Sequence, residues 1–327
     1  MMRIVGNAEG ITLYVSDDAY FSYFNSPYIG HDIGSAIDIY PRKAEWGGAV
    51  VAPAAGKIAR IKKIQMGQPK LFPTDEVDYG IGIQTETSEA NLVRVMHCKP
   101  AVTTGESVGV GDHLGTLIRS RFFNYWTGPH LHVEVVPLEA FKRSSKSYPL
   151  NLEYHYETQP AIEFHDAIEF EVGSVTEDNI IGYASSLGHA RIGSLIGLPA
   201  VGERKKVEGI LDGGISHYKI GGVLGASNLK RGSMVRLMQH PLGIVANVKP
   251  SASLFRRGPS VTTILDGHEL HGLSCFVYTK WFTKKGTPQL ILIPKKYGEL
   301  KGVLTEGEIC ELEITSSNNT VKAEKTK

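Results

Sequence analysis

Short apolar and β-branched runs separated by glycine recur along the whole chain, and this pattern constrains its fold more than any other feature. The 327 residues include 36 Gly, and apolar residues at helical spacing are rare. Glycine supplies the positive φ angles of tight turns at little cost, and short runs rich in Val and Ile are typical of strands. The chain is therefore expected to be mainly β.

A polar connection near residues 145–165, rich in Ser, Asn and Pro, divides the chain into two β-rich parts. A chain of this length usually forms about two domains. We expect a first domain at residues 1–150 and a linker at 151–165. A second β-rich domain, a barrel or a sandwich, is expected at 166–315, followed by a polar, disordered tail at 316–327.

Composition excludes several classes of function and location. The net charge of +1 gives no sign of nucleic-acid binding or of capture by an anionic membrane surface. No run approaches the roughly 18 apolar residues that cross a bilayer. The three cysteines are widely spaced and form no disulfide framework, and residues 1–10 lack the apolar core of a secretory signal. A reducing, cytoplasmic location is the simplest interpretation.

Two histidines spaced two residues apart are the strongest chemical signal in the sequence. His130 and His132 lie in the segment Thr127–Val135, which alternates like a strand. Residues i and i+2 of a strand project to the same face, so both imidazoles are expected on one side of a sheet. Such a pair can place one imidazole on a metal and the other beside a substrate.

The first domain also contains other residues of the types that bind metals. His31 precedes the alternating segment Ser35–Pro41, which contains Asp38, and His97 ends another expected strand. A catalytic zinc site needs three protein ligands and one open position. Further histidines nearby can take a proton from water or stabilise an oxyanion. The chain thus holds enough suitable residues for such a site.

Five segments in a particular order give the chain a recognisable family resemblance. They are Val50–Ile58, Asp78–Gly80, Val95–Cys98, where only the histidine is kept, Gly105–Gly115 and Thr127–Glu134. Over residues 28–137 the chain resembles the M23 family of zinc metallopeptidases, of the lysostaphin and LytM type. Each motif alone is weak, but the combination in this order is specific.

This resemblance implies a fold, a set of site residues and a reaction. The fold would be a two-layer β catalytic domain. His31, Asp38 and His132 would bind Zn²⁺, and His97 and His130 would flank the metal-bound water. The reaction would be metal-assisted hydrolysis of an amide bond. Family substrates are peptide cross-bridges of bacterial cell walls, often cleaved next to Gly, so the expected partner is a peptide substrate.

One departure from the family pattern leaves the first ligand open. The family has His-x-x-x-Asp, but Gly34 stands where that histidine is expected, and His31 lies seven residues before Asp38. A loop three residues longer can still deliver His31 to the metal, and we favour this interpretation because loops tolerate insertions. Alternatively, His31 is displaced and a ligand is lost, or Asp32 takes its place.

Three functions follow from these observations. The first is a zinc-dependent endopeptidase. The second is an M23-like domain that has lost a ligand and serves as a binding or scaffolding module. The third uses only the architecture, which resembles that of phosphotransferase and biotinyl carrier domains, but the chain lacks their Met-Lys-Met carrier motif.

The second domain offers no convergent cluster of titratable groups in its sequence. We expect an independent β domain without chemistry of its own, which positions an unknown partner or covers the zinc cleft. The segments Gly222–Leu237 and Gly302–Leu312 echo each other, which either marks two related barrel units or reflects common hairpin chemistry. The run His268–His271 lacks the His-Glu-x-x-His spacing of zincins and is not expected to bind metal.

Overall fold

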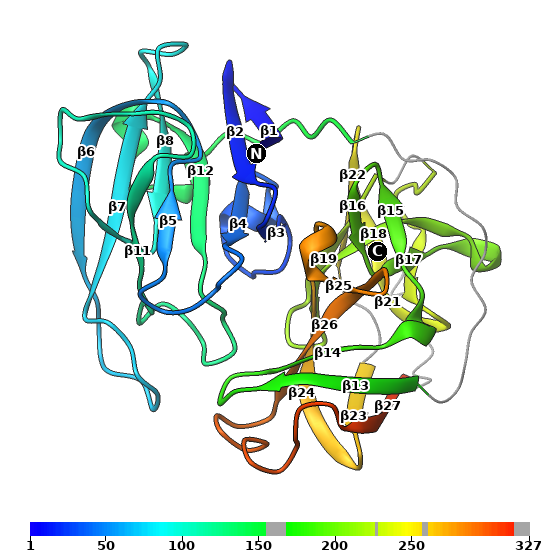
Figure 1. Cartoon of the computed structure of the whole chain (residues 1–327). Coiled ribbons are helices and arrows are strands. Elements are labelled where there is room, and N and C mark those ends of the chain that lie inside the picture. Colours follow the sequence, from blue (N-terminus) through cyan, green and yellow to red (C-terminus); the bar gives the residue numbers. More distant parts are fainter. Residues whose placement is uncertain (155–167, 226–227, 257–260, 317–327) are drawn as a thin grey trace, which may run out of the picture.

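The computed structural model describes residues 1–154, 168–225, 228–256 and 261–316. In these residues the regular structure is almost entirely strand, and α1 (Ile29–Asp32) is a single helical turn. The chain is therefore mainly β, as the glycine-separated runs predict. Figure 1 shows two β-rich bodies. We call residues 1–154 the first region and residues 168–316 the second region.

The first region consists of a large sheet, a small sheet and a hairpin. Its strands are β1 (Met2–Ala8), β2 (Ile11–Ser16), β3 (Tyr20–Ser22), β4 (Ala36–Tyr40), β5 (Ala49–Val51), β6 (Gly56–Gln65), β7 (Val77–Gln84), β8 (Asn91–Met96), β9 (Cys98–Pro100), β10 (Ser107–Val108), β11 (His113–Leu117) and β12 (Leu131–Pro137). The large sheet has the order β10-β6-β7-β8-β12-β4-β3, the small sheet has the order β5-β11-β9, and β1 pairs with β2.

Strand β12 lies inside the large sheet, between β8 and β4, and its side chains alternate between two faces. Leu131, Val133 and Val135 belong to the main apolar core. The residues between them, His132 and Glu134, therefore project to the opposite face. In the antiparallel register His132 lies directly opposite Asp38 of β4. The sheet thus places these two polar side chains together.

The second region contains fifteen named strands, most of them in one large sheet. They are β13 (Ile168–Val175), β14 (Ile180–Tyr183), β15 (Ala190–Ile192), β16 (Leu195–Gly197), β17 (Pro199–Val201), β18 (Val207–Ile215), β19 (Ile220–Leu224), β20 (Met234–Leu237), β21 (His240–Lys249), β22 (Ala252–Arg256), β23 (Val261–Leu265), β24 (His268–Cys275), β25 (Thr283–Lys284), β26 (Thr287–Pro294) and β27 (Ile309–Ser316). Short 3₁₀ turns occur in both regions. Those of the first region are Leu138–Ala140 and Ser144–Lys146, and those of the second are Ser185–Leu187, Glu203–Lys205 and Lys280–Phe282.

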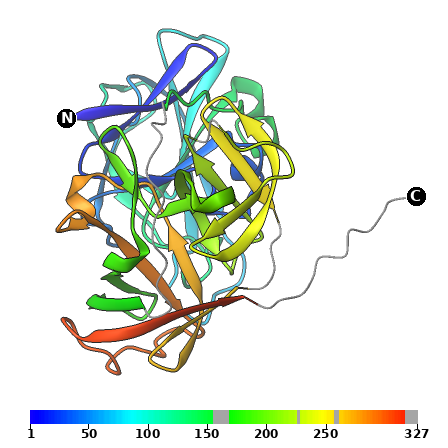
Figure 2. The same ribbon diagram turned by 90° about the vertical axis from the view of Figure 1, so that its right-hand side faces the viewer.

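The strand pairings of the second region close into two rings of six strands. The first ring runs β17-β20-β21-β22-β19-β18 and returns to β17. The second ring runs β24-β23-β27-β13-β14-β26 and returns to β24. The pairing of β18 with β24 joins them. The expected barrel-type second region is therefore present as two linked rings, which Figure 2 shows from their own side with the first region behind.

The two rings agree in the details of their hydrogen bonds. Strand β21 has a register shift just after Val245, and β13 has one just after Val172. Gly232 donates its N–H to the Val245 carbonyl at 2.9 Å, and Gly307 donates to the Val172 carbonyl at 2.8 Å. Both glycines have positive φ, 92° and 84°. Gly232 precedes β20, which pairs with the bulged strand β21, and Gly307 precedes β27, which pairs with the bulged strand β13.

This agreement favours duplication of a unit over chance similarity of hairpins. The sequence echo contains both turn glycines and the strands that follow them, β20 and β27. Its Gly-Val-Leu triplets, however, are not equivalent in structure. Gly222–Leu224 lies in β19, whereas Gly302–Leu304 lies in a turn after β26. The two rings therefore repeat the same strand pairing and turn glycine, whereas the Gly-Val-Leu triplet is not part of the structural repeat.

The two regions meet along the segment that leads into α1. Phe21 and Val277 exchange two backbone hydrogen bonds of 3.0 and 2.9 Å. The Asp212 carboxylate of β18 accepts hydrogen bonds from Ser22 Oγ at 2.5 Å and from the Tyr23 N–H at 2.7 Å. Apolar residues of β18, β19 and β22 belong to the same buried core as the first region. The second region therefore supports the chain just before His31.

Candidate metal centre

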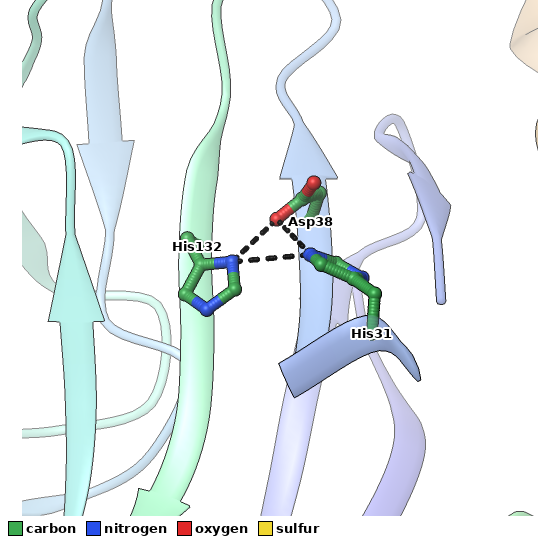
Figure 3. A group of neighbouring side chains, drawn as sticks. All are labelled: His31, Asp38 and His132. Carbon is green, nitrogen blue, oxygen red and sulfur yellow. Dashed lines mark hydrogen bonds and ion pairs between the residues drawn. The ribbon is translucent and has the colours of Figure 1, made fainter. Parts of the chain in front are cut away.

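The three predicted ligands converge on one point (Figure 3). Asp38 comes from β4, His132 from β12 and His31 from α1. The Asp38 Oδ1 atom lies 2.8 Å from His132 Nδ1 and 3.2 Å from His31 Nε2, and the two imidazole nitrogens are 3.3 Å apart. All three side chains are buried. One ligand atom from each residue lies within 4.8 Å of the others, a spacing that could hold a metal ion.

The turn of α1 explains how His31 reaches Asp38 across seven residues. Gly30 and His31 are buried, and Gly30 lies so close to β12 that a Cβ there would come within 2.3 Å of Glu134 Oε1. Gly34 closes the turn with a φ of 68°. Asp32 points elsewhere and pairs with Arg256 of β22. Among the residues considered at this position, His31 is therefore the one beside Asp38.

The second nitrogen of each candidate histidine ligand has a partner that sets its orientation. His31 Nδ1 lies 2.8 Å from the Tyr23 carbonyl. Because a carbonyl only accepts, Nδ1 carries the proton and Nε2 is left with its lone pair. His132 Nε2 lies 3.4 Å from Glu134 Oε1, which leaves Nδ1 facing Asp38. Glu134 in turn forms a buried ion pair with Arg94.

His97 and His130 stand beside the three candidate ligands. His97 Nδ1 lies 2.7 Å from Asp78 Oδ2, and His130 Nδ1 lies 2.8 Å from the Gly128 carbonyl. In each ring Nδ1 is therefore engaged, and Nε2 is the nitrogen left for other contacts. His130 Nε2 lies 3.6 Å from Asp38 Oδ1, and the ring centroids of His97 and His130 are 5.4 Å apart. His97 also has a φ of 64°, a conformation rare for a residue other than glycine.

Burial and neighbouring charges shift the pKa values of the three candidate ligands in different directions. Burial raises the pKa of Asp38, but the neighbouring His31 and His130 and two hydrogen bonds outweigh burial and hold it well below its usual range. Burial lowers the pKa of His132 to about 4 and also lowers that of His130. Burial alone would lower the pKa of His31, but Asp38 raises it above the usual value. Asp38 and His132 therefore favour the ionised carboxylate and neutral imidazole that bind metals, whereas the raised pKa of His31 means that a metal ion would compete there with a proton.

A small cavity of about 40 Å³ adjoins the cluster, and we call it the metal cavity. Asp38, His97, His130 and His132 line it together with aromatic residues of the first region. The second region contributes Tyr218, Ser274 and Phe276. This volume holds only a few water molecules. The second region therefore forms part of the wall of the metal cavity.

A larger cleft of about 620 Å³ between the two regions borders the metal cavity. The two hollows share five lining residues, namely Tyr40, Trp126, Gly128, Ser274 and Phe276. The larger one, which we call the outer cleft, has the size of a ligand site. The two hollows are therefore adjacent.

Several residues around the centre were not identified from the sequence. Glu134 lies two residues after His132, so its place on the same strand face was a usable signal, whereas Asp78 meets His97 only in the folded chain. Tyr23 acts through a backbone carbonyl, so its residue type gives no signal. Tyr218 and Ser274 lie more than 80 residues from the nearest candidate ligand along the chain, so only folding brings them to the cavity.

The other metal-like motifs lie away from this centre. His268 and Glu269 are on the exposed end of β24, and Glu269 pairs with Lys295 at 2.7 Å. His113 is exposed on β11. In the part of the chain that the structure describes, a second group of suitable residues occurs at Asp266, Glu308 and Cys310. His155 and His165, expected at the surface, and most of the expected linker and tail lie outside the described residues.

No helix among the described residues is long and apolar enough to cross a membrane.

Comparison with known proteins gives one family match and two structural neighbours. The family model "Domain of unknown function (DUF8155) N-terminal domain" matches residues 12–152. No curated protein matches this chain. The structure of the antimicrobial peptidase lysostaphin from Staphylococcus simulans is 14% identical, with 58% of this chain and 86% of that chain covered at a TM-score of 0.24. The solution structure of lysostaphin is 13% identical, with 92% and 96% covered at a TM-score of 0.26.

These overall superpositions are poor, so the fold described above rests on the strand pairings themselves. The segment that the family model matches contains all five candidate site residues, from His31 to His132, and ends before the second region. The candidate centre and the matched family domain therefore coincide in the sequence.

Proposed function

We propose that this chain is a zinc-dependent endopeptidase, which hydrolyses a peptide bond with a metal-activated water. The observation that carries the proposal is the convergence of His31, Asp38 and His132. Each offers one ligand atom, and the three atoms lie within 4.8 Å of one another. His97 and His130 beside them complete the set of groups that such a hydrolysis needs. The sequence resemblance to M23 peptidases assigns the same five residues to the same roles.

The donor set suits zinc better than a hard cation. Two imidazoles and one carboxylate form a common catalytic zinc set that leaves a fourth position open, whereas Ca²⁺ and Mg²⁺ prefer oxygen ligands. The Tyr23 carbonyl and the Glu134 carboxylate orient the ligating rings from behind, as such partners do in zinc sites. Bound zinc would polarise the amide carbonyl and lower the pKa of a water molecule.

The proton transfers are assigned to His97 and His130. Each presents a free Nε2 toward the centre because its Nδ1–H is already donated, to Asp78 and to the Gly128 carbonyl. Hydrolysis of an amide needs one group to remove a proton from water and one to protonate the leaving nitrogen. The two rings lie close enough to serve one scissile bond from neighbouring positions.

The shape of the two hollows bears on the substrate. A peptide can extend along the outer cleft of about 620 Å³, whereas the metal cavity, which holds the candidate ligands, is much smaller. We therefore propose that the residues next to the cleaved bond are small. A peptide with Gly at this position, as the family resemblance implies, is the substrate class that fits best.

A binding or scaffolding module is the second candidate function. The observation that favours it is the cover over the metal cavity, which leaves little space for a substrate in this conformation. In this alternative the centre binds metal for stability, or not at all, and no bond is cleaved. Both candidate functions have the same fold, and they differ in whether the protein is expected to hydrolyse a peptide.

Metal content and hydrolysis test the proposal. Purified wild-type protein is expected to hold close to one zinc per chain, and His132→Ala should remove it because a ligand is lost. Mass spectrometry of the metal measures this, with His113→Ala as the matched control because His113 is exposed and distant from the cavity. A wild-type protein without zinc, even after zinc addition, would contradict the proposal.

The proton-handling roles need a separate readout. His97→Ala and His130→Ala should keep zinc but reduce cleavage of a Gly-rich peptide by about 10²–10⁴-fold, the usual contribution of general acid–base groups. Loss of metal in both variants would show that these rings are ligands instead. A wild-type protein that holds zinc but cleaves no Gly-containing peptide supports the scaffolding alternative.

A further inference from the structure

Tyr218 brings an aromatic side chain with a hydroxyl from the second region to the wall of the metal cavity. It lies on the turn between β18 and β19 and lines the cavity together with Asp38, His97 and His130. Ser274 also lines this space, but its Oγ lies 3.4 Å from His217 Nε2. Tyr218 is therefore the better placed of these two second-region hydroxyls to meet a bound substrate.

The hydrogen bonds of Tyr218 define what its hydroxyl can do. The indole N–H of Trp126 donates to the Tyr218 oxygen at 3.0 Å. An indole nitrogen can only donate, so the phenol acts as acceptor in this contact and its own proton is left for another group. The neighbouring Thr127 hydroxyl also interacts with it, and Thr127 lines the same cavity. The phenol proton is thus available at the cavity wall.

The ring of Tyr218 is held in position before any substrate arrives. Its N–H donates to the Gly214 carbonyl at 3.1 Å, and its ring packs against His217 with centroids 4.5 Å apart. A Cβ on Gly214 would come within 2.4 Å of the Tyr218 ring, so glycine is needed there. A donor that needs no reorganisation stabilises developing charge more effectively than a mobile one.

Tyr218 also stays protonated in this position. Burial raises its pKa to about 12, in spite of the hydrogen bonds from Trp126 and Thr127 that act in the other direction. A neutral phenol is a hydrogen-bond donor over the whole pH range in which the histidines can act.

We propose that Tyr218 is a catalytic residue, which donates a hydrogen bond to the carbonyl oxygen of the scissile amide as water adds to the carbonyl carbon. In this step a C–O bond forms, the carbonyl π electrons move to the oxygen, and one histidine takes the proton that the water loses. The Tyr218 hydroxyl stabilises the resulting oxyanion without giving up its proton. The inference rests on the proposed function and assigns chemistry to a region that was expected to carry none.

The variant Tyr218→Phe tests this role by removing one oxygen atom. Loss of a single oxyanion donor reduces kcat by about 10²–10³-fold, and we expect an effect of this size with KM nearly unchanged. Zinc content should stay at the wild-type level, which separates Tyr218 from the ligands. Tyr183→Phe is the matched control, because Tyr183 lies on β14 and does not line the metal cavity.

A binding measurement gives a second readout that a merely structural role would not change. A phosphinate analogue of Gly-Gly carries the oxyanion, so its affinity for zinc-loaded Tyr218→Phe should fall by a factor similar to the loss in kcat. Its affinity for the Tyr183→Phe control should equal that of the wild type. An active wild type whose kcat and phosphinate affinity both survive Tyr218→Phe would overturn this proposal alone. A wild type without zinc or hydrolysis would overturn the proposed function and this inference with it.

Discussion

At the scale of single residues, the candidate centre depends on which nitrogen of each imidazole is free. A histidine can bind a metal or take a proton only through a nitrogen that carries no hydrogen. The Tyr23 carbonyl and the Asp78 carboxylate decide this for His31 and His97, since each holds the Nδ1 proton. The nitrogen that each of these rings presents to the candidate centre is therefore set by acceptors behind the rings.

The buried pair of Glu134 and Arg94 is expected to matter for stability. Glu134→Gln would leave the Arg94 charge uncompensated, and breaking a buried pair of this kind costs about 3–5 kcal/mol. Both side chains are almost fully buried. Urea unfolding measures the loss. Glu177→Gln is the control, because the pair of Glu177 with Lys301 is exposed and should contribute little. Equal stability of the two variants would contradict this account.

Residue types and spacing predicted the members of the centre but not all their partners. His132 could be assigned to a sheet face because a strand alternates, but β12 begins at Leu131 and His130 lies just before it. His31 was ambiguous, since spacing along the chain does not show how a loop folds. Tyr218 was beyond prediction, because its position at the cavity depends on packing between regions that are far apart in sequence.

At the scale of elements, one short helical turn decides whether the third candidate ligand arrives. Strands β4 and β12 bring Asp38 and His132 together through their register alone. His31 lies outside the sheet, so no strand register places it. Its position depends on how closely α1 approaches β12. Gly30 permits that approach, because it has no side chain to meet Glu134.

The variant Gly30→Ala tests the role of this turn. The added methyl group would clash with the Glu134 carboxylate at 2.3 Å and with the Ala36 Cβ at 3.0 Å, so α1 has to shift and carry His31 away. We expect zinc affinity to fall by about 10–100-fold, the range found when ligand positioning is disturbed. Competition with a chromophoric chelator measures the affinity. Gly67→Ala, with no atom within 4 Å of the new methyl group, should bind zinc like the wild type.

Alternation and glycine turns predicted many strands correctly, because both are local properties. Strands β5 to β8 lie in segments whose alternation and turn residues are typical of strands. The apolar run Cys275–Tyr278 has the same composition, but β24 ends at Cys275. Val277 and Tyr278 instead pair singly with Phe21 and Ile196, contacts that no local pattern can show.

At the scale of the whole molecule, the two regions act on each other through Asp212. This buried carboxylate accepts hydrogen bonds from Ser22, Tyr23 and Phe24, the residues that lead to α1. Phe24 also packs over Gly222, where a Cβ would come within 2.0 Å of the ring. The first region therefore relies on the second one for the position of its ligand loop.

Asp212 predicts a characteristic dependence of stability on pH. Burial raises its pKa to about 7, although the three donors oppose this, whereas the unfolded value is near 3.8. Between these values the folded protein binds more protons than the unfolded chain, so its contribution to stability falls as the pH rises from about 4 to 7. Asp212→Asn stays neutral and should lack this slope.

Urea unfolding at several pH values measures the slope for both proteins. The difference in unfolding free energy, wild type minus Asp212→Asn, should decrease steadily across the window from about pH 4 to 7. Two curves that run parallel throughout this window would show that Asp212 titrates alike in the folded and unfolded chains. The interaction between the two regions would then not depend on its charge.

The pairing of β18 with β24, which joins the two rings, also faces the metal cavity. Tyr218 follows β18 and Ser274 belongs to β24. Both residues with hydroxyls that the second region contributes to the cavity lining therefore come from these two paired strands. The outer hairpins of the rings, such as the turn at Asp266 and Gly267, take no part in it. Such tips can accept inserted or exchanged sequence while the candidate centre stays unchanged. For an engineer they offer places to graft a new binding module onto this chain without rebuilding its chemistry.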